Sequence, residues 1–449
     1  MSGLAFLIAS LTTPTYCKDV APILQRRCQI CHHPGTAAPF SLMTYKDAVK
    51  WADNMVEAVG DRRMPPWFAD PNFGHFANDP RLTDEEVRTL KRWACDGGRT
   101  YGNDKHLPPA KEFADGWTIG KPDVIFELPE EQTISATLSE NLRFFLTPSG
   151  FKEGVWIQAV EVRPTNPAVV HHVNVKYRQP GDLYDSGTLI KANPGRMSWT
   201  YPEGHARFIN TDAIWNWDVH YEANGKPGQK DRCQLGVVFY HGPTPPKQVH
   251  ETAGLLNARF AIPPGDPHYK VESMWNVARD VEVTTLSPHM HLRGSAFQVE
   301  VIYPDDVTET ILSVPVYDFN WQLIYELRTP LRLTEGCKIH CTAYFDNSAG
   351  NRYNPDPSKK VQWGDDSTSE MMLCLLDYVA YQGPSGELGS FVECPCPDGL
   401  AKTVQHAPPV PTPSERFVFD IIAGCWWLAA LSPVPLAGIV WIFRRRRKE

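Results

Sequence analysis

The chain lacks the features that suit a protein to nucleic acids or nucleotides. Its 449 residues carry a formal net charge of −8, and basic residues form a run only at the C-terminus, in residues 444–448. A basic stripe is the electrostatic footprint of nucleic-acid binding, so we expect no nucleic-acid partner. The sequence also contains neither a P-loop nor a Rossmann glycine fingerprint.

The composition leaves little room for long helices. Forty of the residues are proline, about twice the usual share, and helix interiors tolerate proline badly. Apolar residues make up 42% and charged residues 21%, which is typical of a globular protein. The length predicts about three domains. The eleven cysteines are an odd number, so one thiol stays free or some cysteines serve another chemistry.

Both ends of the chain carry apolar segments. Residues 421–443 contain no charge and precede the basic run, and this length suffices to cross a bilayer. We expect a transmembrane helix at 417–443 and a cytoplasmic tail at 444–449, because basic residues favour the cytoplasmic side. The protein would then be a single-pass cell-membrane protein with its globular part on the periplasmic side. A buried or amphipathic terminal segment is the alternative. Residues 1–15 fit a weak signal peptide or a disordered tail equally well.

A haem attachment signature lies near the N-terminus. Cys28, Cys31 and His32 form the pattern CxxCH, in which two thiols reach two vinyl groups of one porphyrin and the histidine reaches the iron. Zinc is the weaker alternative because no second ligand pair is close in sequence, and a redox dithiol would not need His32. We therefore expect one covalently bound haem c. Its second axial ligand should be soft or an imidazole, and Met64 in a proline-rigid loop fits best. The rivals are Met43, Met55 and His75.

Short helices are expected around this motif. The apolar spacing predicts helices at 19–27 and 45–59, and a capping box at Thr83 predicts a third. Three short helices around CxxCH indicate a small all-α cytochrome c domain. Cys17 and Cys95 flank it and are candidates for a disulfide in an oxidising compartment.

The middle of the chain changes to short alternating runs. Segments such as 154–162 and 169–177, separated by proline, glycine and asparagine, predict an all-β sandwich region. Its first group of metal-ligand side chains is the pair His171 and His172, with His220 later. Adjacent strand residues point to opposite faces, so a shared ion requires a twist, a bulge or a strand end at the pair. Without a shared ion, one histidine would be buried and the other exposed.

A second group has the spacing of a metal site on a strand. His289 and His291 project from the same strand face and can reach one ion. Met371 follows later in the chain. A thioether beside two imidazoles suits copper, particularly Cu(I), whereas zinc rarely recruits methionine. Core packing is the alternative for a lone methionine.

Together these motifs resemble a known family. The order HH, H before tyrosine, HxH and then EM is similar to the copper type II, ascorbate-dependent monooxygenases, which include peptidylglycine α-hydroxylating and dopamine β-monooxygenases. The resemblance covers roughly residues 120–395 and is strongest to bacterial relatives that carry a fused cytochrome c. Further matching stretches lie at 288–294, 318–322 and 345–348, with MPPW at 64–67.

The resemblance implies two copper ions. By position, the ligands of the electron-transfer copper would be His171, His172 and His220. The ligands of the copper that binds dioxygen would be His289, His291 and Met371, which would then be the catalytic residues.

The resemblance also sets the expected fold class. It is a small all-α cytochrome c domain, two all-β jelly-roll-like sandwiches and a C-terminal transmembrane helix. The expected boundaries are 16–102 for the cytochrome, 103–120 for a linker, 121–265 and 266–400 for the sandwiches, and 401–416 for a proline-rich linker.

Three positions depart from the family. Its arginine two residues before HxH, which helps to hold a peptide carboxylate, is Ser287 here, and a tyrosine four residues after the methionine ligand is Leu375. These departures argue against a C-terminal peptide as the substrate. The family's cysteine after the methionine ligand is Met372, so the disulfide there cannot form in the same way. Cys374, with Cys341, is the candidate replacement.

The implied reaction is hydroxylation of a C–H bond of a small substrate by dioxygen. We expect the fused haem to relay electrons to copper, supplied by an ascorbate-like reductant or by a redox protein. The alternative is a membrane-anchored haem and copper electron-transfer subunit that performs no C–H hydroxylation.

Overall fold

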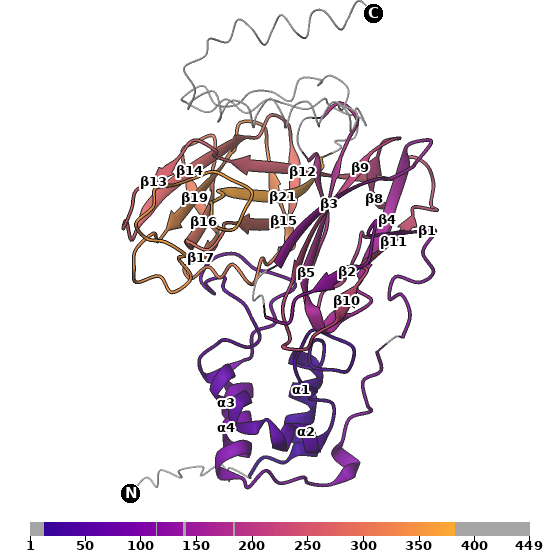
Figure 1. Cartoon of the computed structure of the whole chain (residues 1–449), viewed down its shortest axis with the longest axis vertical. Helices are drawn as coiled ribbons and strands as arrows, with labels where there is room; N and C mark the ends of the chain where they lie inside the picture. Colours follow the sequence, from indigo (N-terminus) through magenta and orange to yellow (C-terminus); the bar gives the residue numbers. More distant parts are fainter. Residues whose placement is uncertain (1–12, 114, 138–140, 183–184, 382–449) are drawn as a thin grey trace, which may run out of the picture. The chain divides into compact units, whose positions relative to one another are not determined.

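The structure, a computed structural model, describes residues 13–113, 115–137, 141–182 and 185–381. Strands account for 38% of it and helices for 13%, so the protein is mostly β-sheet (Figure 1). The fold class expected from the sequence is wrong, because the described residues contain no sizeable all-α N-terminal domain.

The helices are short and pack around a small apolar cluster of their own, which is not the sizeable all-α domain that was expected. The longest, α3, has nine residues. The chain that follows Met64 leaves the helices, and Trp67, Ala69 and Phe76 join an apolar core made by strands. Phe76 also forms a β-bridge with Leu327. The helical elements are η1 (Tyr16–Val20), α1 (Ala21–Arg27), α2 (Tyr45–Lys50), α3 (Ala52–Gly60), α4 (Asp84–Lys91), η2 (Arg92–Asp96), η3 (Asp104–His106) and η4 (Pro167–Val169).

The segments expected at the two termini fall outside the described residues. These are the linker at 401–416, the membrane span at 417–443, the tail at 444–449 and most of residues 1–15. Within the described ranges, no helix is long and apolar enough to cross a membrane.

The first β core lies between two groups of strands that share one apolar cluster. One group has the order β1-β11-β4-β8, with β7 beside β4, and the other has the order β3-β9-β5-β6. A small pair, β10 with β2, accompanies them. The bounds are β1 (Val124–Glu127), β2 (Gln132–Ile134), β3 (Asn141–Pro148), β4 (Val155–Arg163), β5 (Val170–Arg178), β6 (Gly187–Ala192), β7 (Ser198–Thr200), β8 (His205–Ile209), β9 (Ile214–Tyr221), β10 (Gln229–Asp231) and β11 (Gln234–Phe239).

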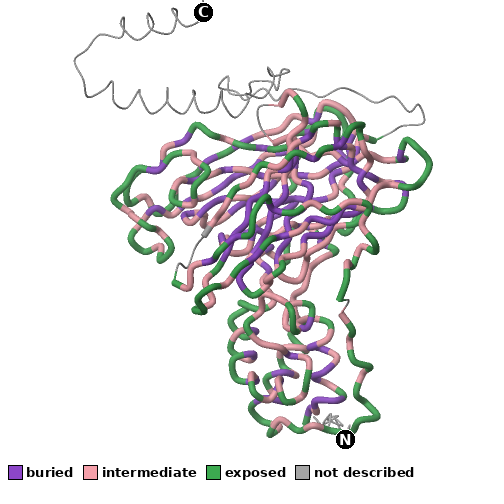
Figure 2. The backbone as a smooth tube through the Cα atoms, turned by 45° about the vertical axis from the view of Figure 1, so that its right-hand side comes forward, coloured by how far each residue is buried: buried purple, intermediate pink, exposed green. Residues whose placement is uncertain are grey.

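The second β core has the same plan. Strands in the order β12-β21-β15-β18 and strands in the order β14-β19-β16-β17 contribute to one apolar cluster. Buried residues run along the strands of both cores (Figure 2). The bounds are β12 (Gln248–Leu256), β13 (Ala261–Ile262), β14 (Tyr269–Asn276), β15 (Val281–His289), β16 (Gly294–Ile302), β17 (Thr308–Val314), β18 (Tyr325–Leu333), β19 (Lys338–Phe345), β20 (Val361–Gln362) and β21 (Leu373–Ala380).

Strand alternation explains how the sequence builds these cores. In β19, Ile339, Cys341, Ala343 and Phe345 are fully buried, while Lys338 at the start of the strand is exposed. Successive strand residues face opposite sides, so every second residue enters the core. A parallel pairing of β8 with β12 then joins one sheet of each core into a nine-stranded sheet.

The described cysteines are all free thiols. Cys17 is buried among the helices whereas Cys95 is exposed, so the candidate pair at the ends of the helical segment is not joined. Cys341 and Cys374 are buried on neighbouring strands and are also free. Their thiols are close enough to share a hydrogen bond.

Candidate functional site

Three histidines meet on the sheet that contains β5 and β9. His171 and His172 belong to β5, and His220 on β9 is the direct cross-strand partner of His172. One ligand nitrogen from each side chain lies within 4.8 Å of the others. The structure therefore brings together all three residues of the first group expected from the sequence.

A β-bulge allows two adjacent histidines to share this site. The register of β5 against β9 shifts between Val170 and His172, so His171 is the extra residue. A bulge re-aims a side chain that would otherwise point to the opposite face. The rings of His171 and His172 consequently both approach His220, with ring centroids 5.1 and 4.9 Å from it.

The nitrogen atoms of this cluster fit a metal ion. Nδ1 of His171 lies 3.2 Å from Nδ1 of His172, and two nitrogens bound at about 2.0–2.1 Å to one tetrahedral ion lie about 3.3 Å apart. Nδ1 of His220 is buried without a hydrogen-bond partner. Buried polar atoms without a partner are costly, and a bound ion would satisfy those that face it.

Burial keeps the imidazoles in the form that binds metals. It lowers the pKa of His171 and holds the pKa of His172 well below its usual range. The pKa of His220 falls to about 4 for the same reason, with His171 adding to the effect. All three rings are therefore neutral at pH 7, as metal coordination requires.

His289 and His291 form a second pair, with ring centroids 5.2 Å apart. Nδ1 of His289 lies 2.9 Å from Oε1 of Gln322, and Nδ1 of His291 lies 3.2 Å from the carbonyl oxygen of Ser369. Each Nδ1–H can donate to its oxygen, which leaves Nε2 of both rings available as a ligand atom. Burial lowers the pKa of both histidines, so they too are neutral at pH 7.

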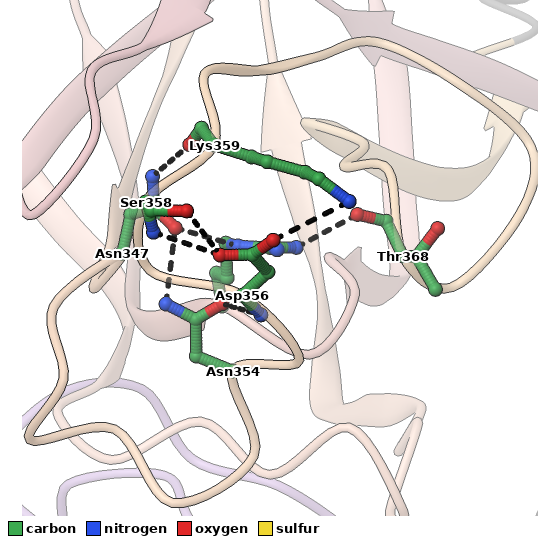
Figure 3. Close-up of polar contacts among 7 residues, drawn as sticks. Asn347, Asn354, Asp356, Ser358, Lys359 and Thr368 are labelled. Atoms are coloured by element: carbon green, nitrogen blue, oxygen red, sulfur yellow. Dashed lines mark hydrogen bonds and ion pairs between the residues drawn. The ribbon is translucent and has the colours of Figure 1, made fainter.

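A buried polar network holds the backbone around this pair. The Glu370 carboxylate accepts hydrogen bonds from the backbone N–H groups of His291 and Arg293, at 2.8 and 2.6 Å. The Arg293 side chain donates to Oδ1 of Asn347 and to the carbonyl oxygen of Thr368. Figure 3 shows Asn347 and Thr368 within a wider network that also includes Asn354, Asp356, Ser358 and Lys359.

Met371 directly follows Glu370 and is half-buried. It precedes β21, whose first residue, Leu373, pairs with His289. The sheet register therefore places the chain segment that carries Met371 beside the end of β15. Burial raises the pKa of Glu370 to about 8.

The CxxCH motif forms a compact turn whose histidine ring is held by the backbone. The His32 N–H donates to the Cys28 carbonyl, so one helical turn carries both residues. Nδ1 of His32 lies 3.1 Å from the carbonyl oxygen of Phe40, a contact that fixes the ring and leaves Nε2 for an iron. Burial raises the pKa of Cys28 to about 12 and of Cys31 to about 11, whereas reactive dithiols have lowered pKa values. Met64 is 36% exposed in the loop after α3.

Some residues of the site were not identified from the sequence. Gln322 and Trp321 entered the sequence analysis only as part of the matching stretch 318–322, but the ring of Trp321 lies 5.8 Å from that of His171. Lys191 is buried on β6 and donates to Oγ of Ser287 at 2.5 Å. A lysine in a strand carries no sequence signal of burial, so only the fold reveals this contact.

The comparisons with known proteins do not identify a family. No family model and no curated protein matches the sequence. The structure is similar to the major capsid protein P2 from bacteriophage PM2, with 10% identity over 59% of this chain and 99% of that chain and a TM-score of 0.23. It is also similar to PNGF-II, with 9% identity over 57% of this chain and 65% of that chain and a TM-score of 0.23. Allantoicase from Saccharomyces cerevisiae is 9% identical over 51% of this chain and 74% of that chain, with a TM-score of 0.17. These likenesses are too weak to carry an argument.

Proposed function

We propose that the protein is a copper-dependent monooxygenase that hydroxylates a C–H bond of a small substrate with dioxygen. The observation that carries the proposal is the cluster of His171, His172 and His220, whose ligand atoms lie within 4.8 Å of one another. Imidazoles suit both copper and zinc, but a second site that used two imidazoles and a thioether would favour copper. The expected ligands there are His289, His291 and Met371.

The chain's own residues orient the donors in this proposal. Gln322 and the Ser369 carbonyl fix the rings of His289 and His291 through Nδ1, so that both present Nε2. Glu370 holds the backbone from His291 to Arg293 through two hydrogen bonds. When bound, copper would supply the one-electron steps and the activation of dioxygen.

The CxxCH motif supplies the electron donor in this scheme. Cys28 and Cys31 would hold a haem c by thioether bonds, with His32 as one axial ligand and Met64 as the other. Neutral His32 with Nδ1 held by a backbone carbonyl is suited to bind iron through Nε2. A haem fixed to the same chain raises the effective concentration of donor beside the copper sites. An ascorbate-like reductant or a redox protein would reduce the oxidised haem again.

Metal analysis combined with oxygen uptake tests the proposal. The full chain, with haem attached, should bind two copper ions per haem and consume oxygen when given a reductant and a small C–H substrate. His172→Ala and His291→Ala should each lose one copper ion and the coupled oxygen uptake. His241→Ala, at an exposed histidine paired with Asp123, is the matched control and should retain both ions. Fewer than two copper ions per haem, or full copper retention in both site variants, would contradict the proposal.

A second candidate function is an electron-transfer subunit that carries haem and copper without hydroxylation. The observation that favours it is the CxxCH motif, in which the His32 ring is held by the carbonyl oxygen of Phe40 and the Cys28 thiol is buried. A haem bound there would serve electron transfer without any substrate site. Haem and copper that exchange electrons but never consume oxygen with any substrate would support this candidate over the enzyme.

A further inference from the structure

The CxxCH motif lies directly against a tight turn of the β region. Residues 193–196, the 193–196 turn, are closed by two hydrogen bonds between the backbones of Asn193 and Arg196, at 3.1 and 2.8 Å. Pro194 and Gly195 are the central residues, and Gly195 has a φ of +89°, as a type II turn requires. A Cβ atom on Gly195 would lie 2.6 Å from Sγ of Cys31. The turn thus contacts one of the two sulfurs that would hold the haem.

A second segment contacts four of the five histidines of the two clusters. In residues 318–322, the 318–322 segment, the ring of Trp321 lies 5.8 Å from that of His171. The ring of Phe319 lies 6.5 Å from that of His220 and 5.8 Å from that of His291. Gln322 bonds to His289, the remaining histidine of the second pair.

The 193–196 turn and the 318–322 segment are joined by a buried contact. Nδ2 of Asn193 donates to the backbone carbonyl of Gln322 at 3.5 Å, and both residues are buried. Beside this contact, Arg196 forms an ion pair with Glu326 at 2.5 Å. A route therefore runs from Cys31 across a van der Waals contact to Gly195, along the backbone to Asn193, and through two hydrogen bonds to His289.

We propose that the 193–196 turn and the 318–322 segment conduct electrons from the haem at Cys28 and Cys31 to the metal-binding histidines. The proposal rests on the proposed function, since it requires both haem and copper. In each transfer ferrous haem loses one electron and Cu(II) gains it, and no bond forms or breaks. The hydrogen bond between Gln322 and His289 is the last step of the route to the second pair. The rings of Trp321 and Phe319 connect the 318–322 segment to the cluster of His171, His172 and His220.

Intramolecular reoxidation of the haem tests this route. The full chain, loaded with haem and Cu(II), is mixed without oxygen with less than one equivalent of a one-electron reductant. The absorbance of ferrous haem should rise and then decay in a phase whose rate does not depend on protein concentration. Asn193→Ala removes the hydrogen bond to Gln322 and should slow this phase, with copper content and haem potential unchanged.

A pair of glycine variants provides the matched control. Gly195→Ala places a methyl group on Sγ of Cys31 and should slow the phase by forcing the turn and the motif apart. Gly225→Ala adds the same backbone strain, since the φ of Gly225 is +75°, but its added methyl group has no atom within 4 Å. It should decay at the wild-type rate.

The outcomes separate the route from the proposed function. If wild-type protein binds both cofactors and shows the intramolecular phase, but Asn193→Ala and Gly195→Ala decay at the same rate as wild type, the route is wrong while the relay stands. If wild-type protein shows no such phase with both cofactors bound, the relay itself is wrong. If it binds no copper or no haem, the proposed function fails and the route fails with it.

Discussion

Replacing Lys191 by methionine should stabilise the protein at neutral pH and do so much less at high pH. Lys191 is only 4% exposed, and its ammonium group donates to Oγ of Ser287. Burial lowers its pKa from 10.5 to about 8, and the nearby Lys176 acts in the same direction. Asp218 and Asp377 oppose the shift without cancelling it. The folded protein therefore holds a charge at a substantial cost in free energy.

The size of the effect follows from the two pKa values. The difference between 10.5 and about 8 corresponds to about 3 kcal/mol at pH 7. Between about pH 8 and pH 10.5 the unfolded chain binds more protons than the folded one. The free energy of unfolding of the wild type therefore rises with pH across this range. By pH 10 about 1 kcal/mol of the cost remains. Lys191→Met also loses the hydrogen bond to Ser287, which lowers the stability of the variant by about 1 kcal/mol at either pH.

Denaturant unfolding of Lys191→Met and wild type at pH 7 and pH 10 measures the effect. We expect a gain of about 2 kcal/mol at pH 7 and almost none at pH 10. The same substitution at Lys338, which is exposed on β19, should change stability by less than about 0.5 kcal/mol at either pH. A difference between Lys191→Met and wild type that is equal at the two pH values would refute the reasoning.

Two further predictions concern stability. Asp377→Asn removes the charge that pairs with the fully buried Arg207 at 2.9 Å and should cost about 3–5 kcal/mol in denaturant unfolding; a loss below about 1 kcal/mol would show that other groups balance the arginine. Thr83→Ala removes the hydrogen bond that Oγ1 of Thr83 accepts from the backbone N–H of Glu86, one of the two bonds of the capping box, and should cost about 1 kcal/mol, measured in the same way. Thr89→Ala, inside the same helix, is its control and should not destabilise the protein.

Local features of the fold could be predicted from the sequence because they depend on neighbours in the chain. The helix start at Thr83 is confirmed, and its capping box is present. The expected helix at 45–59 is instead two helices, α2 and α3, because Trp51 leaves the helical conformation between them. The expected strands at 154–162 and 169–177 appear as β4 and β5, each displaced by one residue.

Features that depend on distant residues could not be predicted in this way. The sequence showed that His171 and His172 could share an ion only if the strand were distorted, but only the pairing with β9 shows the bulge. The all-α domain was expected because the segment around CxxCH favours helices. The segment carrying Trp67 and Phe76 instead packs into a β core built from strands far along the chain.

The sequence by itself determined which donors the protein carries. The imidazoles, thiols and thioethers are in its composition. Strand periodicity predicted that His289 and His291 share one strand face, but β15 ends at His289 and His291 lies beyond it. Only the tertiary structure decided that Gln322 holds His289, that Lys191 is buried beside Ser287, and that Gly195 touches Cys31. The physical reason is that such contacts depend on sheet register and on loop closure across long stretches of chain. A shift of one residue in β6 would turn the Lys191 side chain to the opposite face of its sheet.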